Sequence, residues 1–495
     1  MSGIINNLFN NVNRTLIYLF VVGWVLLIVY STLKMGILIG SVISLLPIML
    51  LFFIALVQSP FLGFVMFFMT NYFISGLSRY IKAIAPGITI DILLAIVIIT
   101  LIISSLKKGS DIKFSNAFNG LSLAAFIWLV YCVFEIFNPY SSSIVAWLTS
   151  VRGIGIYFFI IVVLVTVIMR KFKDFKRILF IWAILSLLAV LKAFFQKTLG
   201  FDFAESRWLY VEGAAATHVI YSGIRYFSFF TDAGNFGTGI AFSGVVFGIS
   251  SFYFKEPKMR FFYLFTAAAC LYGMLLSGTR GSLAVPFVGL TIYAIISKKF
   301  KTLTITTILV VATFIFLRFT YYGQGNTYIR RMRSFFNTDD ASYVVRVVNQ
   351  ARVRTYLYNK PIGVGIGMSR GEATNYRTDA VLSKIPADSW YVLIWMETGI
   401  VGLLLHVLII LYIIFHGGYL VFFRLKNHQL KGLMAALLCG ICGIYVASYS
   451  LEIIGQFPFG PIQYICMAFI FLSPVYDKEL AEADLIKSKK NEPES

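Results

Sequence analysis

The chain has 495 residues, of which 59% are hydrophobic and only 13% are charged. Soluble domains are about 45–50% apolar and about one-quarter charged, and their cores cannot bury this much apolar surface at this chain length. The composition excludes a soluble enzyme, a disordered chain and a collagen-like fibre. It predicts an all-α fold, a polytopic bundle of transmembrane helices. The net charge of +20 would suggest nucleic acid in a soluble protein, but basic loops beside anionic membrane lipids explain it more simply here.

Apolar runs of about 20 residues, the length that crosses a bilayer, recur along the whole chain. The second and third of these runs are divided only by residues 58–60, where the proline could equally kink one continuous helix. No small-residue cleavage site closes the first run, so we interpret it as a retained span. We expect about fourteen spans, near residues 15–33, 35–57, 60–77, 88–106, 119–137, 150–169, 177–196, 233–254, 261–278, 282–297, 302–319, 393–423, 432–451 and 459–475.

The short connections between these spans alternate between basic and nearly uncharged segments. Basic clusters occur at residues 107–113, 170–177, 255–260, 298–301 and 424–431. Because cytoplasmic loops carry the excess of Lys and Arg, this set is assigned to the cytoplasm, with both termini. Residues 1–475 are thus expected to form one multi-pass domain in the cytoplasmic (inner) membrane, and residues 476–495 a disordered cytoplasmic tail.

Two long connections, at about residues 197–232 and 320–390, fall on the outer side in this topology. The second carries ten basic residues against five acids, and eight of the ten are arginine. The guanidinium fork suits phosphate oxygens, so this loop predicts an anionic ligand. A loop that is merely soluble is the alternative.

An arginine interrupts the apolar sequence at Ser277-Gly-Thr-Arg280-Gly-Ser282. A charge at that depth is costly and therefore marks a functional candidate, although an arginine reaching the membrane surface would look similar. A second motif, Arg225-Tyr-Phe-Ser228 followed by Asn235, ends the first long connection. Its side chains supply hydrogen-bond donors for phosphate or sugar hydroxyls. The alternative, that Thr231 or Asp232 simply caps the next helix, accounts for only one residue of the motif.

Residues 341–358 of the long loop read as a helix. At 100° per residue, Arg346, Gln350 and Arg354 share one arc, so two guanidiniums could face one anion. The alternative is an amphipathic helix that binds lipid headgroups. The glycine-rich segment Lys360–Gly367 that follows could grip a ligand through its amides or could be a plain connector.

Two acidic residues flank the start of the next span. Asp388 or Ser389 at the start of this span is most simply a helix cap, beside Trp390 and Tyr391 in an interfacial aromatic belt. The alternative role for Asp388 is a general base at the membrane surface. Glu397 is unusual within an apolar run and could pair with an outer arginine. No metal or other cofactor is expected, because the five cysteines lie in apolar runs and the four histidines do not cluster.

These motifs, in this order over about residues 215–410, resemble the O-antigen ligase and O-antigen polymerase family of bacterial envelope glycosyltransferases. The matching stretches are RYFSFFTDAGNFG, SGTRG, RTYLYNKPIGVGIG and ETGIVGLLL. The sequence departs from the ligases at the loop histidine that they usually carry before the last stretch, where this chain has Asp388-Ser389.

The resemblance implies metal-independent transfer of a glycan from a polyprenyl diphosphate to an acceptor sugar at the outer face of the membrane. The acceptor would be another lipid-linked repeat, lipid A-core or a protein. Arg225 and Arg280 would hold the diphosphate, Arg354 would assist them, and Asp388 would take the role of base. The remaining candidate ligand contacts are Arg346, Ser228, Asn235 and Glu397. The rival functions are a lipid-linked glycan flippase and a peptidoglycan polymerase of the shape-and-division class.

Overall fold

The computed structural model describes residues 14–35, 43, 59–107, 109–110, 112–220, 223–297, 300–336, 341–369 and 381–490. The described residues divide into two compact units. The smaller unit draws on residues 1–64 and 95–110, and the larger one on residues 65–94 and 111–495. The smaller unit contains α2 (Arg14–Met35), and it shares α4 (Pro60–Tyr80) and α5 (Pro86–Ser105) with the larger unit.

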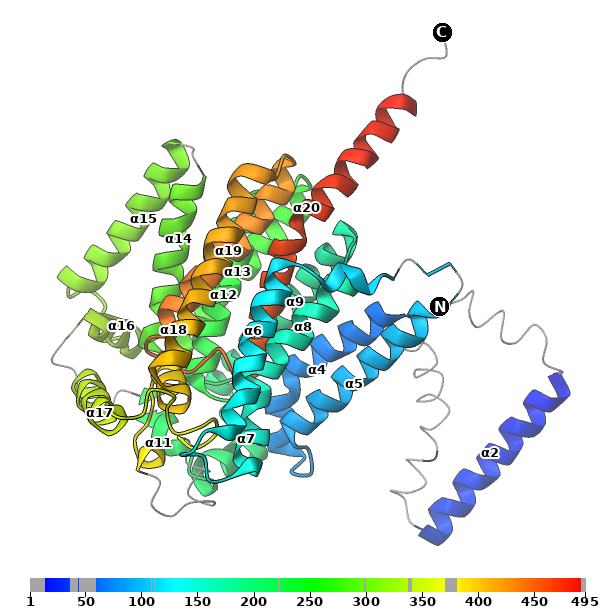
Figure 1. The fold of residues 1–495 in the computed structure, drawn as a ribbon, viewed down its shortest axis with the longest axis horizontal. Coiled ribbons are helices and arrows are strands. Elements are labelled where there is room, and N and C mark those ends of the chain that lie inside the picture. The colour runs from blue at the N-terminus through cyan, green and yellow to red at the C-terminus, as the bar shows by residue number, and fades with distance from the viewer. Residues whose placement is uncertain are drawn as a thin grey trace. The chain divides into compact units, whose positions relative to one another are not determined.

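Most of the described chain is helical (Figure 1), and the prediction of an all-α polytopic membrane protein is confirmed. Ten described helices are long and apolar enough to cross a membrane. Besides α4 and α5 they are α6 with η2 (Gly120–Phe137), α7 to α8 (Ile144–Ile168, through η3 at Arg152–Ile156), α9 (Phe172–Thr198), α12 (Ala233–Ser251), α13 (Pro257–Ser277), α18 with η9 (Trp390–Arg424), α19 (His428–Ala447) and α20 (Phe459–Lys490).

Shorter apolar helices account for further expected spans. They are Val22–Ser31 within α2, η5 with α14 (Arg280–Ile296), and Leu303–Phe319 within α15 (Phe300–Phe319). Every expected span except the second therefore coincides with a helix. The second, at residues 35–57, falls almost entirely outside the described residues.

The two long connections carry the remaining elements. The first contains α10 (Phe203–Ser206), η4 (Arg207–Val211), α11 (Ala215–His218) and a small antiparallel hairpin, β1 (Val219–Ile220) with β2 (Gly223–Ile224). The second contains α16 (Thr327–Arg333), η6 (Ser334–Phe336), α17 (Ala341–Leu357) and η8 (Leu382–Lys384). A further short turn, η1 (Phe114–Ala117), precedes α6. The predicted helix at residues 341–358 is confirmed to within one residue.

Helix α12 is the most enclosed of the membrane helices and packs against α13, α14 and α19. Its glycines permit this close packing, as small residues do at membrane helix contacts. A side chain added at Gly239 would overlap the ring of Phe459, and one at Gly237 would overlap Ser277. The tight packing fixes the first turn of α12, which holds Asn235.

The glycine-rich segment after α17 serves packing in this structure. Its Gly363 and Gly365 have positive φ angles, and the segment lies against the kink in α18 at Gly399, where φ is also positive. The amides of Val364 and Gly365 donate to the carbonyls of Met396 and Glu397, each at 3.0 Å. These two amides are used within the protein, so the connector interpretation describes them better than the ligand-gripping one.

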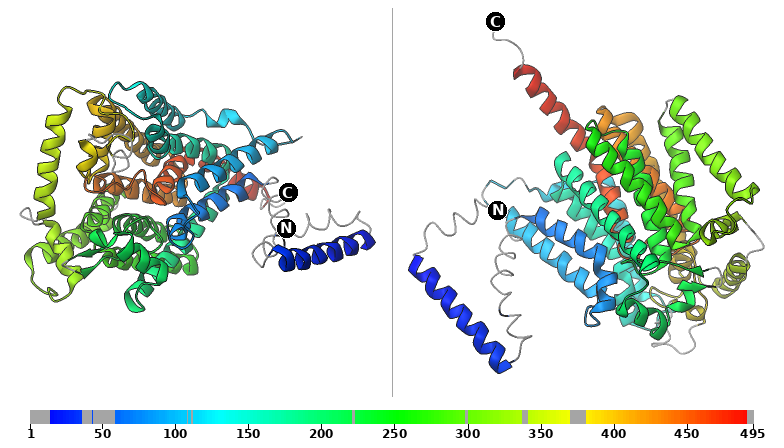
Figure 2. Two further views of the ribbon diagram at one scale, coloured as in Figure 1. Left: turned by 90° about the horizontal axis from the view of Figure 1, so that it is seen from below. Right: turned by 180° about the vertical axis from the view of Figure 1, so that it is seen from behind.

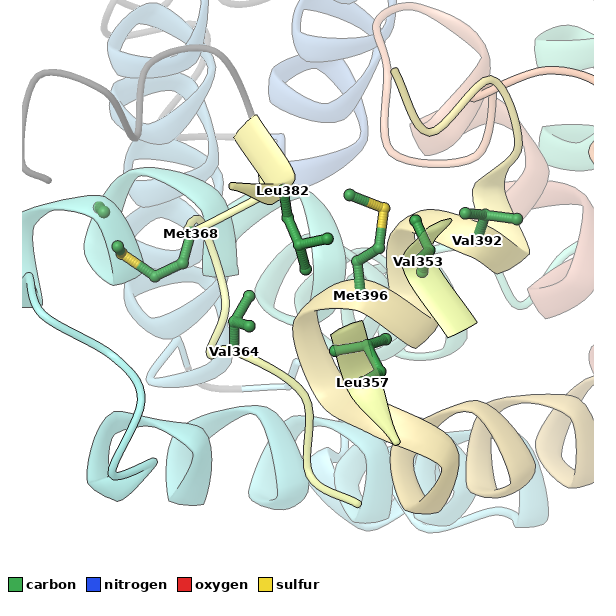
Figure 3. Packing of buried hydrophobic residues seen from close by; sticks show 8 residues of the cluster. Val353, Leu357, Val364, Met368, Leu382, Val392 and Met396 are labelled. Atoms are coloured by element: carbon green, nitrogen blue, oxygen red, sulfur yellow. The ribbon is translucent and has the colours of Figure 1, made fainter. Parts of the chain in front are cut away.

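A small apolar core joins this segment to its neighbours (Figure 3). Val353 and Leu357 of α17 pack with Met396 of α18, with Val364 and with Leu382 of η8. This core holds α17 against the end of α18.

Two expectations are corrected. Helix α20 continues without a break to Lys490, so the described part of the expected disordered tail is helical. Trp390 is 1% exposed, and its indole N–H donates to Nε2 of His406 at 2.9 Å. It is therefore buried inside the protein instead of lying in an interfacial belt.

Candidate active site

A cavity of about 950 Å³ opens where several elements of the larger unit meet. It is lined from α11, the start of α12, the turn between α13 and α14, α16, η6, α17 and the connections before α18 and after α19. In Figure 1, α11, α16 and α17 gather at the lower end of this unit. The cavity thus joins the two long connections that the sequence places on one side of the membrane.

Five of the predicted site residues line this cavity: Arg225, Asn235, Arg280, Arg346 and Asp388. They come from positions up to 163 residues apart, and the fold brings them together.

Arg225 and Arg280 are both held by hydrogen bonds, and Arg225 reaches the SGTRG turn itself. Arg225 donates through Nη1 to the carbonyl of Thr217 and through Nη2 to Oγ1 of Thr279, each at 3.0 Å. Arg280 donates through Nη1 to Oγ of Ser334 in η6, also at 3.0 Å. The turn is compact because the Thr279 hydroxyl donates in turn to the carbonyl of Ala233, at 2.9 Å.

Arg331 is a cavity residue that the sequence interpretation did not single out. It lies on α16, is 9% exposed, and its guanidinium packs onto Gly278. Gly278 ends α13 with φ of 56°, and a Cβ there would lie 2.8 Å from Nη1 of Arg331. Among the described residues, this Nη1 atom has no hydrogen-bond partner. The arginine excess of the loop pointed to Arg331 only as one of eight arginines.

The three guanidiniums form one electropositive cluster. Burial lowers the pKa of Arg331 to about 10, and the nearby positive charges of Arg225 and Arg280 act in the same direction. The pKa of Arg225 is also lowered, chiefly by burial and further by Arg280, while Asp232 opposes the shift. An anion in the cavity would therefore stabilise the charged forms of Arg225 and Arg331.

Asp388 presents a carboxylate to the same cavity. Its φ of 49° is in the left-handed region, which aspartate adopts more readily than most residues other than glycine. Among the described residues its carboxylate makes no hydrogen bond or ion pair. Ser389, not Asp388, occupies the N-cap position of α18, and its side chain makes no capping hydrogen bond there. Of the two residues expected as a possible helix cap, Ser389 therefore holds the position and Asp388 does not.

Asn235 offers an acceptor to the site. It is 3% exposed, and its amide nitrogen donates to Oε1 of Gln456 at 3.1 Å. Its Oδ1 atom has no partner within the described part of the chain. Asp232, the N-cap of α12, accepts from the backbone N–H of Asn235 at 2.9 Å. A buried acceptor of this kind usually has a hydrogen-bond partner, which a bound hydroxyl or water would supply.

His218 lines the cavity, but both of its ring nitrogens are used. Nε2 accepts from the backbone N–H of Ala233 at 3.1 Å, which assigns the proton to Nδ1, 2.9 Å from the carbonyl of Ala214. Burial lowers the pKa of the imidazole, which favours this neutral form. His218 holds the start of α12 and is a poor candidate for the missing loop histidine.

The other three predicted site residues do not line the cavity. Ser228 is buried, and its hydroxyl donates to the carbonyl of Ala189 at 2.7 Å. Glu397 is fully buried and accepts from the hydroxyl of Ser369 at 2.7 Å. Arg354 is exposed on α17.

Arg79 explains why Ser228 lies where it does. This arginine is 5% exposed, sits over the rings of Trp208 and Phe227, and donates to the carbonyls of Ser228 and Phe230. It therefore fixes the backbone that leads into α12 and the cavity. The sequence shows Arg79 only as a basic residue at the end of a span.

Residues 265–407 match a family model described as O-antigen ligase. This match includes Arg280, Arg331, Arg346, Asp388 and Glu397, whereas Arg225 and Asn235 precede it. No curated protein matches the chain. The resemblance stated from the motifs is thus confirmed over residues 265–407, and the chain is a multi-pass membrane protein in which this part matches the O-antigen ligase family.

Proposed function

We propose that the cavity is the site at which a glycan leaves a polyprenyl diphosphate and joins an acceptor sugar. The reaction takes place at the outer face of the cytoplasmic membrane and uses no metal. The observation that carries this proposal is the convergence of Arg225, Arg280 and Arg331 with Asp388 in one cavity.

The arginine cluster stabilises the leaving group. When the bond between the anomeric carbon and the diphosphate oxygen breaks, its electron pair remains on that oxygen. Fixed guanidiniums that face this growing negative charge lower the barrier without having to reorganise. Arg331 contributes most clearly to this effect, because its buried Nη1 atom has no partner among the described residues.

Asp388 is the general base. As the acceptor hydroxyl oxygen bonds to the anomeric carbon, its proton passes to the Asp388 carboxylate, which is open to the cavity. Asn235 and Arg346 contact the glycan or the diphosphate from either side. Ser228 and Glu397 act by positioning the backbone around the site, since they lie outside the cavity wall.

The test is a transfer assay on the full chain reconstituted in lipid vesicles with a synthetic polyprenyl-diphosphate glycan. Arg280→Ala should abolish transfer while the protein remains folded in the membrane, because one guanidinium facing the leaving group is lost. Full activity of this variant would contradict the proposal.

The same preparation separates transfer from the rival function. A flippase would move the lipid-linked glycan between leaflets without forming a new glycosidic bond. Transport without product would therefore favour the flippase over the transferase.

A further inference from the structure

Helix α17 presents two apolar faces, of which the protein covers only one. Val353 and Leu357 on the inner face are 0% and 5% exposed and belong to the core beside α18 (Figure 3). Arg346, on the same side of the helix, lines the cavity.

The outer face carries valines where a water-facing helix would carry polar residues. Val344, Val347 and Val348 are 49%, 50% and 44% exposed. With Ala351 and Thr355 they fall within an arc of roughly 100° at the helical period. These side chains form the outer stripe of α17, and leaving them in water would be unfavourable.

Arginines border this stripe on both edges. At the helical period, Arg352 lies on one edge of the stripe and Arg354 on the other, and both side chains are exposed. An apolar stripe flanked by cations is the pattern of a helix that lies in the membrane interface. A second copy of the chain would bring the same cations against it, so repulsion disfavours a self-contact.

The orientation of α17 within the larger unit fits such a location. In Figure 1 it is seen nearly end-on, whereas α14 and α15 run along the plane of the view. Seen from below in the left view of Figure 2, the axis of α17 lies in the plane of the picture. Its axis therefore crosses those of the apolar helices α14 and α15, and it would lie parallel to a membrane that they enter.

We propose that the outer stripe of α17 rests on the outer leaflet, with Arg352 and Arg354 at the lipid phosphates. This inference depends on the chain being a membrane protein and does not require the transfer reaction. Its consequence is that one helix contacts the lipid surface with one face and the cavity with the other. A lipid-linked ligand would then meet Arg346 at the depth of its own headgroup.

The test is a cysteine scan of α17 in the full chain, reconstituted in vesicles that contain phosphatidylglycerol. The five native cysteines are all buried, so a polar fluorophore reports the introduced ones. Labels at Val344, Val348 and Ala351 should be quenched by nitroxide lipids and shielded from aqueous iodide. Labels at Asn349 and Gln350, on the other side, are the matched controls and should show weaker lipid quenching.

Two results would overturn the proposal. Strong iodide quenching at Val348 would place the stripe in water. Shielding of Val348 from both quenchers would mean that protein covers it.

The arginines are tested separately. In anionic vesicles, replacing Arg352 and Arg354 with glutamine should lower the ratio of lipid-bound to unbound α17 about fivefold per arginine. In vesicles of phosphatidylcholine alone, the same replacement should have little effect. An equal loss in both lipids would contradict the assignment of these arginines to anionic headgroups.

Discussion

At the scale of single residues, burial separates the arginines that the sequence presents as equals. Arg330 and Arg331 are neighbours on α16, but Arg330 is exposed and Arg331 lines the cavity. Sequence spacing favoured Arg346 with Arg354, and the fold brings only the first of these to the cavity. The partner of each guanidinium depends on packing between distant segments, which local periodicity does not encode.

Arg331→Ala should lower kcat for transfer about 10²–10³-fold, the usual loss when one preorganised donor is removed from a developing anion. Arg331→Lys should restore only part of the activity, since lysine keeps the charge but lacks the planar fork. The measurement is steady-state kinetics in vesicles. Arg330→Ala is the matched control, and an equal loss in that variant would show that the effect is not specific to the cavity.

Asp388→Asn should reduce kcat about 10²–10⁴-fold, the range of general base catalysis, and leave the KM for the donor nearly unchanged. Asparagine tolerates the left-handed backbone at this position, so the variant keeps its fold. Unchanged turnover would remove Asp388 from the mechanism.

His218 should make stability depend on pH. Its folded-state pKa is below the ordinary value of 6.5, so the unfolded chain binds this proton more readily. The stability that neutral His218 contributes to the fold is present above about pH 6.5. It is lost as the pH falls from there toward the folded-state pKa. Thermal unfolding in detergent between pH 7 and pH 5 should show a smaller decline for His218→Gln than for the unsubstituted chain. Identical slopes would contradict this assignment.

At the scale of elements, hydrophobic pattern predicted the described apolar helices and α17, because apolar length and period are properties of local sequence. It did not predict the short helices α10, α11 and α16 of the long connections. It did not predict the role of the glycines. Gly363, Gly365 and Gly399 adopt positive φ angles where two segments cross. Such close approaches arise from tertiary packing, and the sequence motif alone fits a ligand loop equally well.

Gly278 offers a test of this packing. Gly278→Ala would place a Cβ against the Arg331 guanidinium and should lower transfer markedly. Gly213→Ala is the matched control, since its φ of 86° is also positive but nothing lies within 4 Å of the new Cβ. Both variants should lose about 1–2 kcal/mol of stability from the left-handed conformation, measured by thermal unfolding. Equal transfer by the two variants would contradict the role of Gly278 in seating Arg331.

At the scale of the whole molecule, the order of motifs along the chain predicted the family match over residues 265–407, and both long connections contribute residues to the cavity. Arg225 of the first connection and Arg331 of the second line one cavity with the turn at Arg280. The alternation of charge between spans assigns the two long connections to the outer face of the membrane, and this assignment remains a prediction. The identity of Arg331 required the three-dimensional arrangement.

The most direct test of the central claim is the glycan profile of a strain that lacks this gene, with the unsubstituted or the Arg280→Ala gene returned. We predict that only the unsubstituted gene restores the profile. Without it, long glycan on polyprenyl diphosphate with a bare acceptor would identify a ligase, and an acceptor bearing a single repeat would identify a polymerase. Restoration by Arg280→Ala, or repeats held on the inner leaflet, would contradict transfer at this cavity.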